Sequence, residues 1–336
     1  MDQPILEIKH LKTYFKTKNT TSKAVDDITF SLMPGETYGL VGESGCGKST
    51  TCRSIMQIIH KPGEIVGGEI MYQGKDLLKM SKKELQSIRG SEIGMIFQEP
   101  MTSLNPVLKI KEQIYENLKD KNMTKAQKKE RALELLRLVG IPMPEQRLNE
   151  YIHQFSGGMR QRVMIAITLA ANPKILLADE PTTALDVTIQ DQIINLLNEL
   201  KEKLNMSIIL ITHDLGVVAQ MCDYVAVMYA GHIVEQADTI TLMTKPCHPY
   251  TDALLRSIPH GKRNPHARLE NIEGTPPDLE AMPAGCPFAP RCKYATEICR
   301  KELPEMTEHG YDHTVACHNV DALLAARSKE PHAERK

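Results

Sequence analysis

GESGCGKST, residues Gly42–Thr50, fits the pattern G-x-x-x-x-G-K-[ST]. The apolar run TYGLV precedes it and TTCRSIMQII follows, so the pattern lies between a predicted strand and a predicted helix. Glycines in such a loop let successive backbone N–H groups point at phosphates, and the helix N-terminus adds partial positive charge. Lys48 is placed to reach the β- and γ-phosphates, and Ser49 to ligate Mg²⁺. The sequence therefore predicts an ATP-binding loop made of Gly42, Glu43, Ser44, Gly45, Cys46, Gly47, Lys48, Ser49 and Thr50.

Two acidic residues follow an apolar run downstream, in KILLADEP. Asp179, at the end of a predicted buried strand, is placed to hold the Mg²⁺ shell, and Glu180 to polarise the attacking water. An acidic pair in this position is often only a solvated strand end. In a chain that also carries a phosphate loop, the pair predicts ATP hydrolysis.

Composition limits the class of protein. The chain has 336 residues and a formal charge of −1, so we expect no general attraction to nucleic acid or acidic lipid. No apolar run approaches the roughly 20 residues that span a bilayer, and MDQPILEIKH lacks the features of a signal peptide. The sequence predicts a soluble cytoplasmic chain, in which any membrane role depends on a partner.

Strand and helix signals alternate along the chain. Strand-like runs fill the first 95 residues, a helical pattern covers about 111–150, and strands return in KILLADE, SIILITHD and YVAVMYAGHIVEQ. This alternation favours an α/β fold with a buried, largely parallel sheet and a helical subdomain inserted at about 100–160. After about residue 245 proline and glycine become dense. We therefore expect a nucleotide-binding domain over 1–246 and a loop-rich extension over 247–336.

The segment FSGGMRQR resembles the signature sequence of a known family. On this segment the chain closely resembles the ATP-binding subunits of ABC transporters, whose signature reads LSGGQ; Phe155 and Met159 depart from that pattern. The resemblance implies a P-loop NTPase core of the ABC type. It also implies a head-to-tail dimer, in which the helix opened by Ser156, Gly157 and Gly158 caps the γ-phosphate held by the other subunit.

Further elements match the family in order, from residue 5 to about 245. The resemblance implies that Gln98 senses Mg²⁺ and water, that Asp186 crosses the dimer interface, and that His213 contacts the γ-phosphate. Phe15 is the aromatic residue expected to stack on adenine, with Tyr14 as the alternative. The implied catalytic residues are Glu180, His213, Gln98 and Lys48, and the implied Mg²⁺ ligands are Ser49, Gln98 and Asp179.

Four cysteines lie close together near the carboxy-terminal end of the sequence: Cys286, Cys292, Cys299 and Cys317. No C-x-x-C knuckle or ferredoxin-type run is present, so the spacing predicts four converging thiolates without naming a metal. His313 and His318 are possible substitute ligands, although we expect each to be a solvated loop residue.

The extension carries a resemblance of its own. HPYTDALLRSIP, EGTPPDL, AGCPFAPRC and HTVAC resemble the carboxy-terminal extension of oligopeptide and dipeptide importer ATPases. Some members of that group hold a [4Fe-4S] cluster on four such cysteines. The resemblance implies such a cluster here, with zinc or unliganded thiols as the alternatives.

The resemblance also implies partners and a location. The chain is expected to be the energy-coupling ATPase of a peptide importer at the cytoplasmic face of the cell membrane. Its expected partners are a second ATPase subunit, identical or paralogous, two membrane permease subunits and, indirectly, an extracytoplasmic peptide-binding protein. Nickel or another small solute stays open as cargo, because other subunits select it. A soluble ABC ATPase acting on nucleic acid is disfavoured by the near-neutral charge, and a nucleotide kinase by FSGGMRQR.

Overall fold

The computed structural model describes residues 3–120, 122–257 and 272–329. The chain forms two compact units, each built from segments that are not consecutive. The insertion unit comprises Met1–Leu6, Ser31–Thr37 and Met71–Thr212, and the phosphate-loop unit comprises Glu7–Phe30, Tyr38–Ile70 and His213–Lys336. The domain boundary that the sequence predicts at residues 246 and 247 stays a prediction. Within the predicted extension, 258–271 and 330–336 lie outside the described residues.

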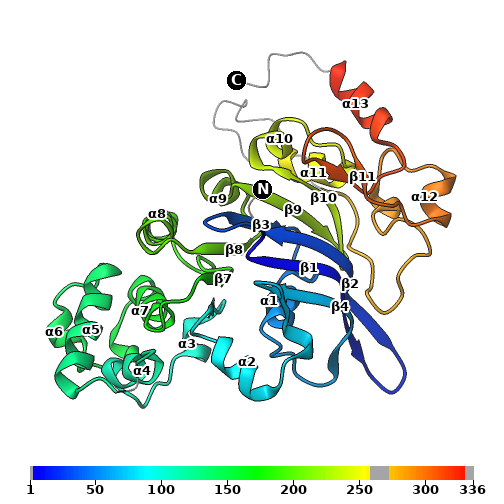
Figure 1. Cartoon of the computed structure of the whole chain (residues 1–336). Coiled ribbons are helices and arrows are strands. Elements are labelled where there is room, and N and C mark those ends of the chain that lie inside the picture. The colour runs from blue at the N-terminus through cyan, green and yellow to red at the C-terminus, as the bar shows by residue number, and fades with distance from the viewer. Residues whose placement is uncertain (1–2, 121, 258–271, 330–336) are drawn as a thin grey trace. The chain divides into compact units, whose positions relative to one another are not determined.

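An N-terminal sheet belongs mainly to the phosphate-loop unit. Burial alternates along its first strand, where Leu6, Ile8 and Leu11 are fully buried between more exposed neighbours, because only one face packs on a core. These strands form a sheet of their own, so the expectation of one largely parallel sheet is wrong for the N-terminal segments. The order in this sheet is β2 (Thr21–Leu32), β1 (Leu6–Lys16), β4 (Gly63–Tyr72) and β5 (Lys75–Asp76) (Figure 1).

A second set of strands in this unit holds the phosphate loop. β3 (Thr37–Val41) pairs in parallel with β9 (Tyr224–Tyr229), and β9 pairs antiparallel with β10 (His232–Asp238). Ala230 and Gly231, both with positive φ, make the tight turn between β9 and β10. β10 in turn pairs with β12 (Thr314–Val315), which pairs with β11 (Thr307–Glu308). Strands from the predicted extension therefore continue this set.

The helices of the phosphate-loop unit are short. The first follows the phosphate loop, and the others come after His213 in the chain (Figure 1). Their bounds are α1 (Lys48–Ile55), α9 (Leu215–Met221), α10 (Thr239–Thr244), α11 (Pro249–Arg256), the 3₁₀ turn η3 (Ala289–Arg291), α12 (Glu297–Lys301) and α13 (Val320–Ser328).

The insertion unit contains three parallel strands whose side chains are all buried. β6 (Ile93–Ile96), β7 (Ile175–Asp179) and β8 (Ser207–Thr212) pair in this order, as expected for strands covered on both faces. Most of the unit's helices lie between β6 and β7 in the chain, which confirms the predicted helical insertion (Figure 1). The helical elements are η1 (Leu77–Lys79), α2 (Lys82–Ile88), α3 (Pro100–Ser103), α4 (Ile110–Asn117), α5 (Lys125–Leu138), α6 (Pro144–Arg147), η2 (Ile152–Gln154), α7 (Gly157–Leu169) and α8 (Val187–Leu204).

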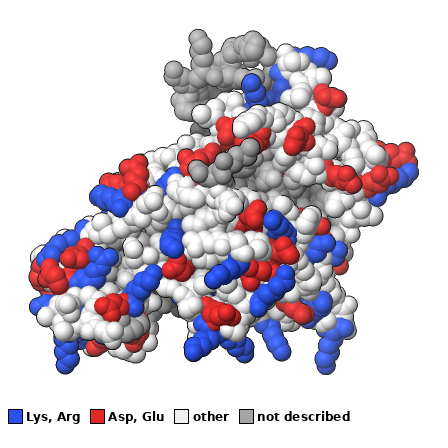
Figure 2. Space-filling model, viewed as in Figure 1, with Lys and Arg blue, Asp and Glu red and all other residues white. Residues whose placement is uncertain are grey.

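The surface carries charges of both signs. Figure 2 shows acidic and basic side chains interspersed over the visible face, in agreement with the formal charge of −1. In the described part of the chain no helix combines the length and the apolar character that crossing a membrane requires.

Candidate ATP site and cysteine site

The phosphate loop joins β3 to α1, and its glycines are required by geometry. Gly42 has φ +150° and Gly47 has φ +108°, a region that other residues adopt only with strain. A Cβ atom on Gly42 would lie 2.2 Å from the carbonyl oxygen of Met228, and one on Gly47 would lie 2.2 Å from that of Ala24. The backbone can therefore follow this path only with glycine at both positions.

Lys48 is turned into the loop. Its Nζ atom donates hydrogen bonds to the carbonyl oxygens of Gly42 (2.7 Å) and Glu43 (2.9 Å), and the residue is 4% exposed. The neighbouring Cys46 is buried, and burial raises the pKa of its thiol. Cys46 is therefore a neutral packing residue, and Lys48 brings the positive charge to the loop.

Glu43 is fixed by residues of the predicted extension. Arg291 donates from Nη1 to Glu43 Oε2 (2.8 Å) and from Nη2 to Oε1 (3.1 Å), and the backbone N–H of Glu43 donates to the hydroxyl of Tyr250 (2.9 Å). Sequence reasoning missed these contacts, because it assigned HPYT and APRC to the extension alone.

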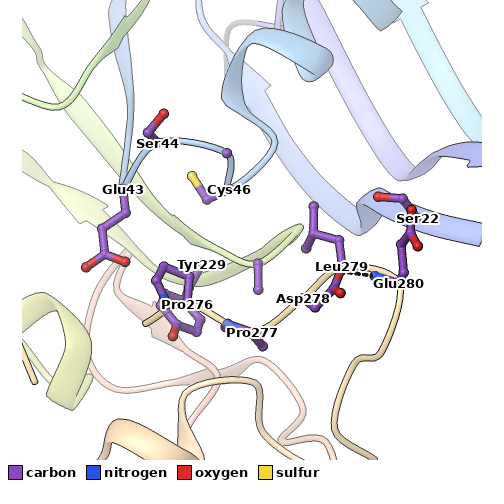
Figure 3. A pocket seen from close by; sticks show the side chains of 12 residues that line it. Ser22, Glu43, Ser44, Cys46, Tyr229, Pro276, Pro277, Asp278, Leu279 and Glu280 are labelled. Atoms are coloured by element: carbon purple, nitrogen blue, oxygen red, sulfur yellow. Dashed lines mark hydrogen bonds between the residues drawn. The ribbon is translucent and has the colours of Figure 1, made fainter. Parts of the chain in front are cut away.

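A cavity of about 360 Å³ opens beside the outer side of the loop. Figure 3 shows the segment Pro276–Glu280 running past Glu43, Ser44 and Cys46, with Tyr229 between them. The backbone N–H of Lys23 donates to the carbonyl oxygen of Leu279 (3.3 Å), which ties this segment to β2. Residues from the carboxy-terminal part therefore form one wall beside the phosphate loop.

The two candidate adenine-stacking residues point to opposite faces of β1. Thr13 Oγ1 lies 2.8 Å from Ser54 Oγ of α1, so Thr13 and Phe15 share the face toward the phosphate-loop helix. Tyr14 points the other way, and its hydroxyl donates to Asp26 Oδ1 (2.6 Å). Of the two candidates, Phe15 is thus the one on the face toward α1, and its adenine role stays a prediction.

We expect Phe15→Ala to raise the Kd for ATP about tenfold, because a base stacked on an aromatic ring contributes roughly 1–3 kcal/mol. Tyr14→Ala, its matched control, is expected to change the Kd less than about twofold relative to wild type, on the same stacking argument. Titration of each variant with a fluorescent ATP analogue measures this. A larger effect from Tyr14 than from Phe15 would reverse the assignment.

Asp179, Glu180 and Gln98 lie in the insertion unit. Asp179 ends β7 and is fully buried. Glu180 follows with φ +47°, and its Oε2 accepts hydrogen bonds from Gln98 Nε2 (3.1 Å) and Thr183 Oγ1 (2.8 Å). The structure thus brings Gln98 and Glu180 together, and it adds Thr183, which sequence reasoning did not select.

The signature segment opens α7 as predicted. Ser156 is its N-cap residue and makes no side-chain capping hydrogen bond, and Ser156 and Gly157 are exposed. A Cβ atom on Gly158 would lie 2.6 Å from Ile189 Cγ2, so this glycine permits close packing against α8. The helix therefore presents its first N–H groups to solvent, where an anion can reach them.

Asp186 lies at the start of α8, and His213 lies just after β8. Asp186 caps α8, and its Oδ1 accepts from the backbone N–H of Ile189 (3.0 Å). His213 follows β8 directly, is exposed and belongs to the phosphate-loop unit. Asp186 thus caps a helix, and the dimer-interface role expected of it stays a prediction.

The four clustered cysteines line one small cavity together with His318 and Asn319. Backbone N–H groups two residues further along the chain donate to Cys292 Sγ (from Tyr294, 3.4 Å) and to Cys317 Sγ (from Asn319, 3.4 Å). The Asn319 side-chain amide donates to Cys299 Sγ (3.2 Å). The predicted convergence of the cysteines is present, and hydrogen-bond donors surround the sulfurs.

Burial favours the protonated form of two of these thiols. It raises the pKa of Cys292 to about 11 and that of Cys317 to about 12. Without a cation the Cys292 and Cys317 thiols are neutral at pH 7, so a bound cation would have to displace their protons.

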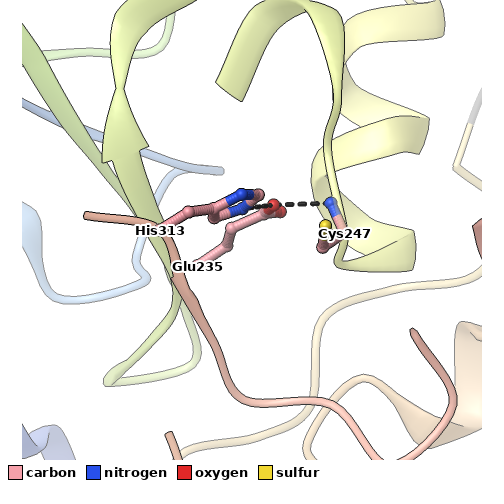
Figure 4. Close-up of side chains that lie close together, drawn as sticks. All are labelled: Glu235, Cys247 and His313. Carbon is pink, nitrogen blue, oxygen red and sulfur yellow. Dashed lines mark hydrogen bonds and ion pairs between the residues drawn. The ribbon is translucent and has the colours of Figure 1, made fainter. Parts of the chain in front are cut away.

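The expectation that His313 is a solvated loop residue is wrong. This histidine is neither a solvated loop residue nor a member of the cysteine site, because it is 3% exposed and its Nε2 lies 2.8 Å from Glu235 Oε1. Glu235 also accepts from the backbone N–H groups of Cys247 (2.6 Å) and His248 (3.0 Å). Figure 4 shows Glu235, Cys247 and His313 lying together from three segments. One potential ligand atom from each lies within 4.8 Å of the other two.

Hydrogen bonds with Cys247 and Glu235 raise the pKa of His313 to about 10. Because the pKa of His313 is raised on folding, its charged pair with Glu235 stabilises the fold fully at a pH below about 6.5, the pKa of histidine in the unfolded chain. This stabilisation is lost as the pH rises toward about 10. We expect the free energy of unfolding to fall by up to about 3 kcal/mol more in wild type than in His313→Gln between pH 7 and 10. Urea titrations of both proteins measure the difference, and parallel pH profiles would contradict the pairing.

Comparison with known proteins identifies the family. The profile described as "ABC transporter" matches residues 25–183, and "Oligopeptide/dipeptide transporter, C-terminal region" matches residues 234–299. The oligopeptide transport ATP-binding protein OppD of Bacillus subtilis is 53% identical over 313 residues, which cover 93% of this chain and 87% of that protein. The dipeptide transport ATP-binding protein DppD of the same species is 49% identical over 335 residues, covering 98% and 100%.

A solved structure agrees with these matches. The ATP-binding cassette MJ0796, determined as a dimer bound to ADP and Pi, has a TM-score of 0.63 and 29% identity; the match covers 70% of this chain and 98% of that one. The fold is therefore that of an ABC ATPase, and the chain hydrolyses ATP. The chain belongs to the family of ATP-binding subunits of oligopeptide and dipeptide ABC transporters.

Proposed function

We propose that this chain powers the import of dipeptides or oligopeptides as a peripheral subunit at the cytoplasmic face of the cell membrane. The observation that carries the proposal is the match to transport proteins named for these peptides, along 93% of the chain for OppD and 98% for DppD, the carboxy-terminal part included. Its partners are a second ATPase subunit, two permease subunits and, indirectly, a peptide-binding protein.

The site residues support a division of labour in hydrolysis. Lys48 and the loop N–H groups hold the phosphates, and Ser49, Gln98 and Asp179 would hold Mg²⁺, which supplies positive charge to the phosphate oxygens. Glu180 accepts a hydrogen bond from the attacking water.

Two further groups complete the site in this proposal. His213 contacts the γ-phosphate. The exposed N-terminus of α7, with Ser156, Gly157 and Gly158, meets the γ-phosphate held by a facing subunit, and Asp186 lies at that interface.

The test is to isolate the complex from membranes and measure its ATPase rate with peptides and binding protein. Dipeptides or oligopeptides are expected to raise the rate several-fold, and nickel ions to leave it unchanged. A complex without permease subunits, or one stimulated by nickel alone, would contradict the proposal.

We also propose that Cys286, Cys292, Cys299 and Cys317 hold a [4Fe-4S] cluster. Four sulfurs around one cavity, with N–H donors directed at them, suit a thiolate-bound cluster. A tetrahedral zinc ion would need sulfurs about 3.8 Å apart. Among the described residues, three potential metal ligands lie within 4.8 Å of one another only in the group Glu235, Cys247 and His313. No three of the four cysteine sulfurs are that close together.

Anaerobically purified protein is expected to absorb at about 400 nm and to contain iron and acid-labile sulfide. Cys292→Ser should lose this absorbance, whereas Cys52→Ser, a matched change of a buried cysteine in α1, should keep it. Stoichiometric zinc, or the absence of any metal, would contradict the cluster.

A further inference from the structure

The side chain of Arg291 is 5% exposed, and its guanidinium makes five hydrogen bonds. Two go to the Glu43 carboxylate of the phosphate loop, at 2.8 and 3.1 Å, in a bidentate arrangement. A third goes to the hydroxyl of Tyr229 at the end of β9 (3.1 Å). The last two go to the carbonyl oxygens of Ile272 (3.2 Å) and Glu273 (3.0 Å). One side chain therefore joins the loop, a strand and the carboxy-terminal part.

The surroundings hold this guanidinium in place. The rings of Tyr229 and Tyr250 pack with centroids 4.6 Å apart, and Phe288 lies 5.2 Å from Tyr229. Tyr250 also accepts the hydrogen bond from the Glu43 backbone N–H. Glu43 is thus held at its backbone by Tyr250 and at its carboxylate by Arg291.

Arg291 also positions the wall of the adjacent cavity. The carbonyls of Ile272 and Glu273 lie at the start of the segment that reaches Pro276–Glu280. That segment lines the cavity opposite Glu43, Ser44 and Cys46 (Figure 3). Without Arg291, this segment would lose two anchoring hydrogen bonds close to the loop.

Besides its hydrogen bonds, Arg291 supplies a positive charge next to the Glu43 carboxylate. Glu43 places a carboxylate, 25% exposed, within a loop that must receive the negative phosphates of ATP. Arg291 neutralises that carboxylate. Removing the arginine would leave an unpaired negative charge in the loop, and this charge would repel the nucleotide.

We propose that Arg291 is a positioning residue for ATP binding, which acts through Glu43 to hold the first half of the phosphate loop open to phosphate. This role makes the affinity for ATP depend on the carboxy-terminal part of the chain. It rests on ATP binding by the loop, and neither on the cargo nor on the group held by the cysteines.

The test uses the full chain with Arg291→Ala, Arg291→Lys, Glu43→Gln and the double variant Arg291→Ala/Glu43→Gln. Arg300→Ala is the matched control, since Arg300 is an exposed arginine beside Cys299. We measure the Kd for MgATP, and the KM and kcat for hydrolysis. Melting temperature and iron content are recorded on the same preparations.

Arg291→Ala is expected to raise the Kd and KM about tenfold, with kcat within about twofold of wild type, because the loss falls on ground-state binding. Arg291→Lys should be intermediate, since an ammonium cannot reproduce the bidentate fork. The double variant should bind ATP more tightly than Arg291→Ala, because it lacks the unpaired carboxylate.

Two results would overturn the proposal: Arg291 variants that bind ATP as Arg300→Ala does, or a double variant that is weaker than Arg291→Ala. If the alanine variant does not fold, Arg291→Lys with and without Glu43→Gln decides the question. Missing iron in wild type would refute the cluster proposal and leave these comparisons unaffected.

Discussion

Replacing Glu180 with Gln is expected to lower kcat for ATP hydrolysis by about 10²–10³-fold, because the amide cannot accept a proton from the attacking water. The amide has nearly the shape of the carboxylate and keeps an oxygen that can accept from Gln98 Nε2 or Thr183 Oγ1. ATP binding should therefore stay within about threefold of wild type, since removing a group that acts on the water spares the ground state.

Steady-state hydrolysis and equilibrium binding of MgATP separate the two effects. Glu202→Gln is the matched control, because Glu202 is an exposed glutamate on α8 away from this hydrogen-bonded group. Turnover near that of the control would remove Glu180 from catalysis. Equal losses of binding and turnover would indicate a structural role for the carboxylate.

Replacing Gly47 with Ala is expected to weaken ATP binding more than about 100-fold, since each 1.4 kcal/mol of strain is worth a factor of ten. The added Cβ would lie 2.2 Å from the Ala24 carbonyl oxygen, and φ of +108° is strained for alanine. The loop backbone must therefore move, and its N–H groups leave the phosphate positions.

Gly45→Ala provides a control within the same loop. Gly45 also has positive φ, +80°, but an added Cβ would meet no atom within 4 Å. Gly45→Ala should weaken ATP binding only about tenfold, because the energy cost of left-handed backbone for alanine is roughly 1–2 kcal/mol. Melting curves of both variants show whether the fold survives. Equal Kd values for the two would show that the contact with Ala24 does not matter.

Local motifs could be predicted because their chemistry depends on short spacing. The phosphate loop, Glu180 after a buried strand, and Ser156 opening a helix all follow from neighbours in sequence, and the structure has each in the expected local setting. The helical insertion followed from periodicity in the same way. The separate N-terminal sheet did not, because strand periodicity leaves partner strands undetermined.

Long-range pairs could not be predicted. Glu43 and Arg291 are 248 residues apart, and Glu235 and His313 are 78 apart, so neither pair has a local signal. A loop histidine is expected in solvent, and no neighbour in sequence indicates that His313 is buried. Its burial depends on β12 pairing with β10, which sequence patterns of two residues do not reveal.

The pairing of β12 with β10 has a consequence for protein engineering. The N–H of Ala316 donates to the Val234 carbonyl oxygen (2.8 Å), so the carboxy-terminal part covers the open edge of β10. A chain cut at residue 246 would expose backbone donors and acceptors ready to pair with another copy. It would also strip Glu235 of its partners at Cys247, His248 and His313. Chimaeras between transporters should therefore exchange β10 and everything after it as one piece.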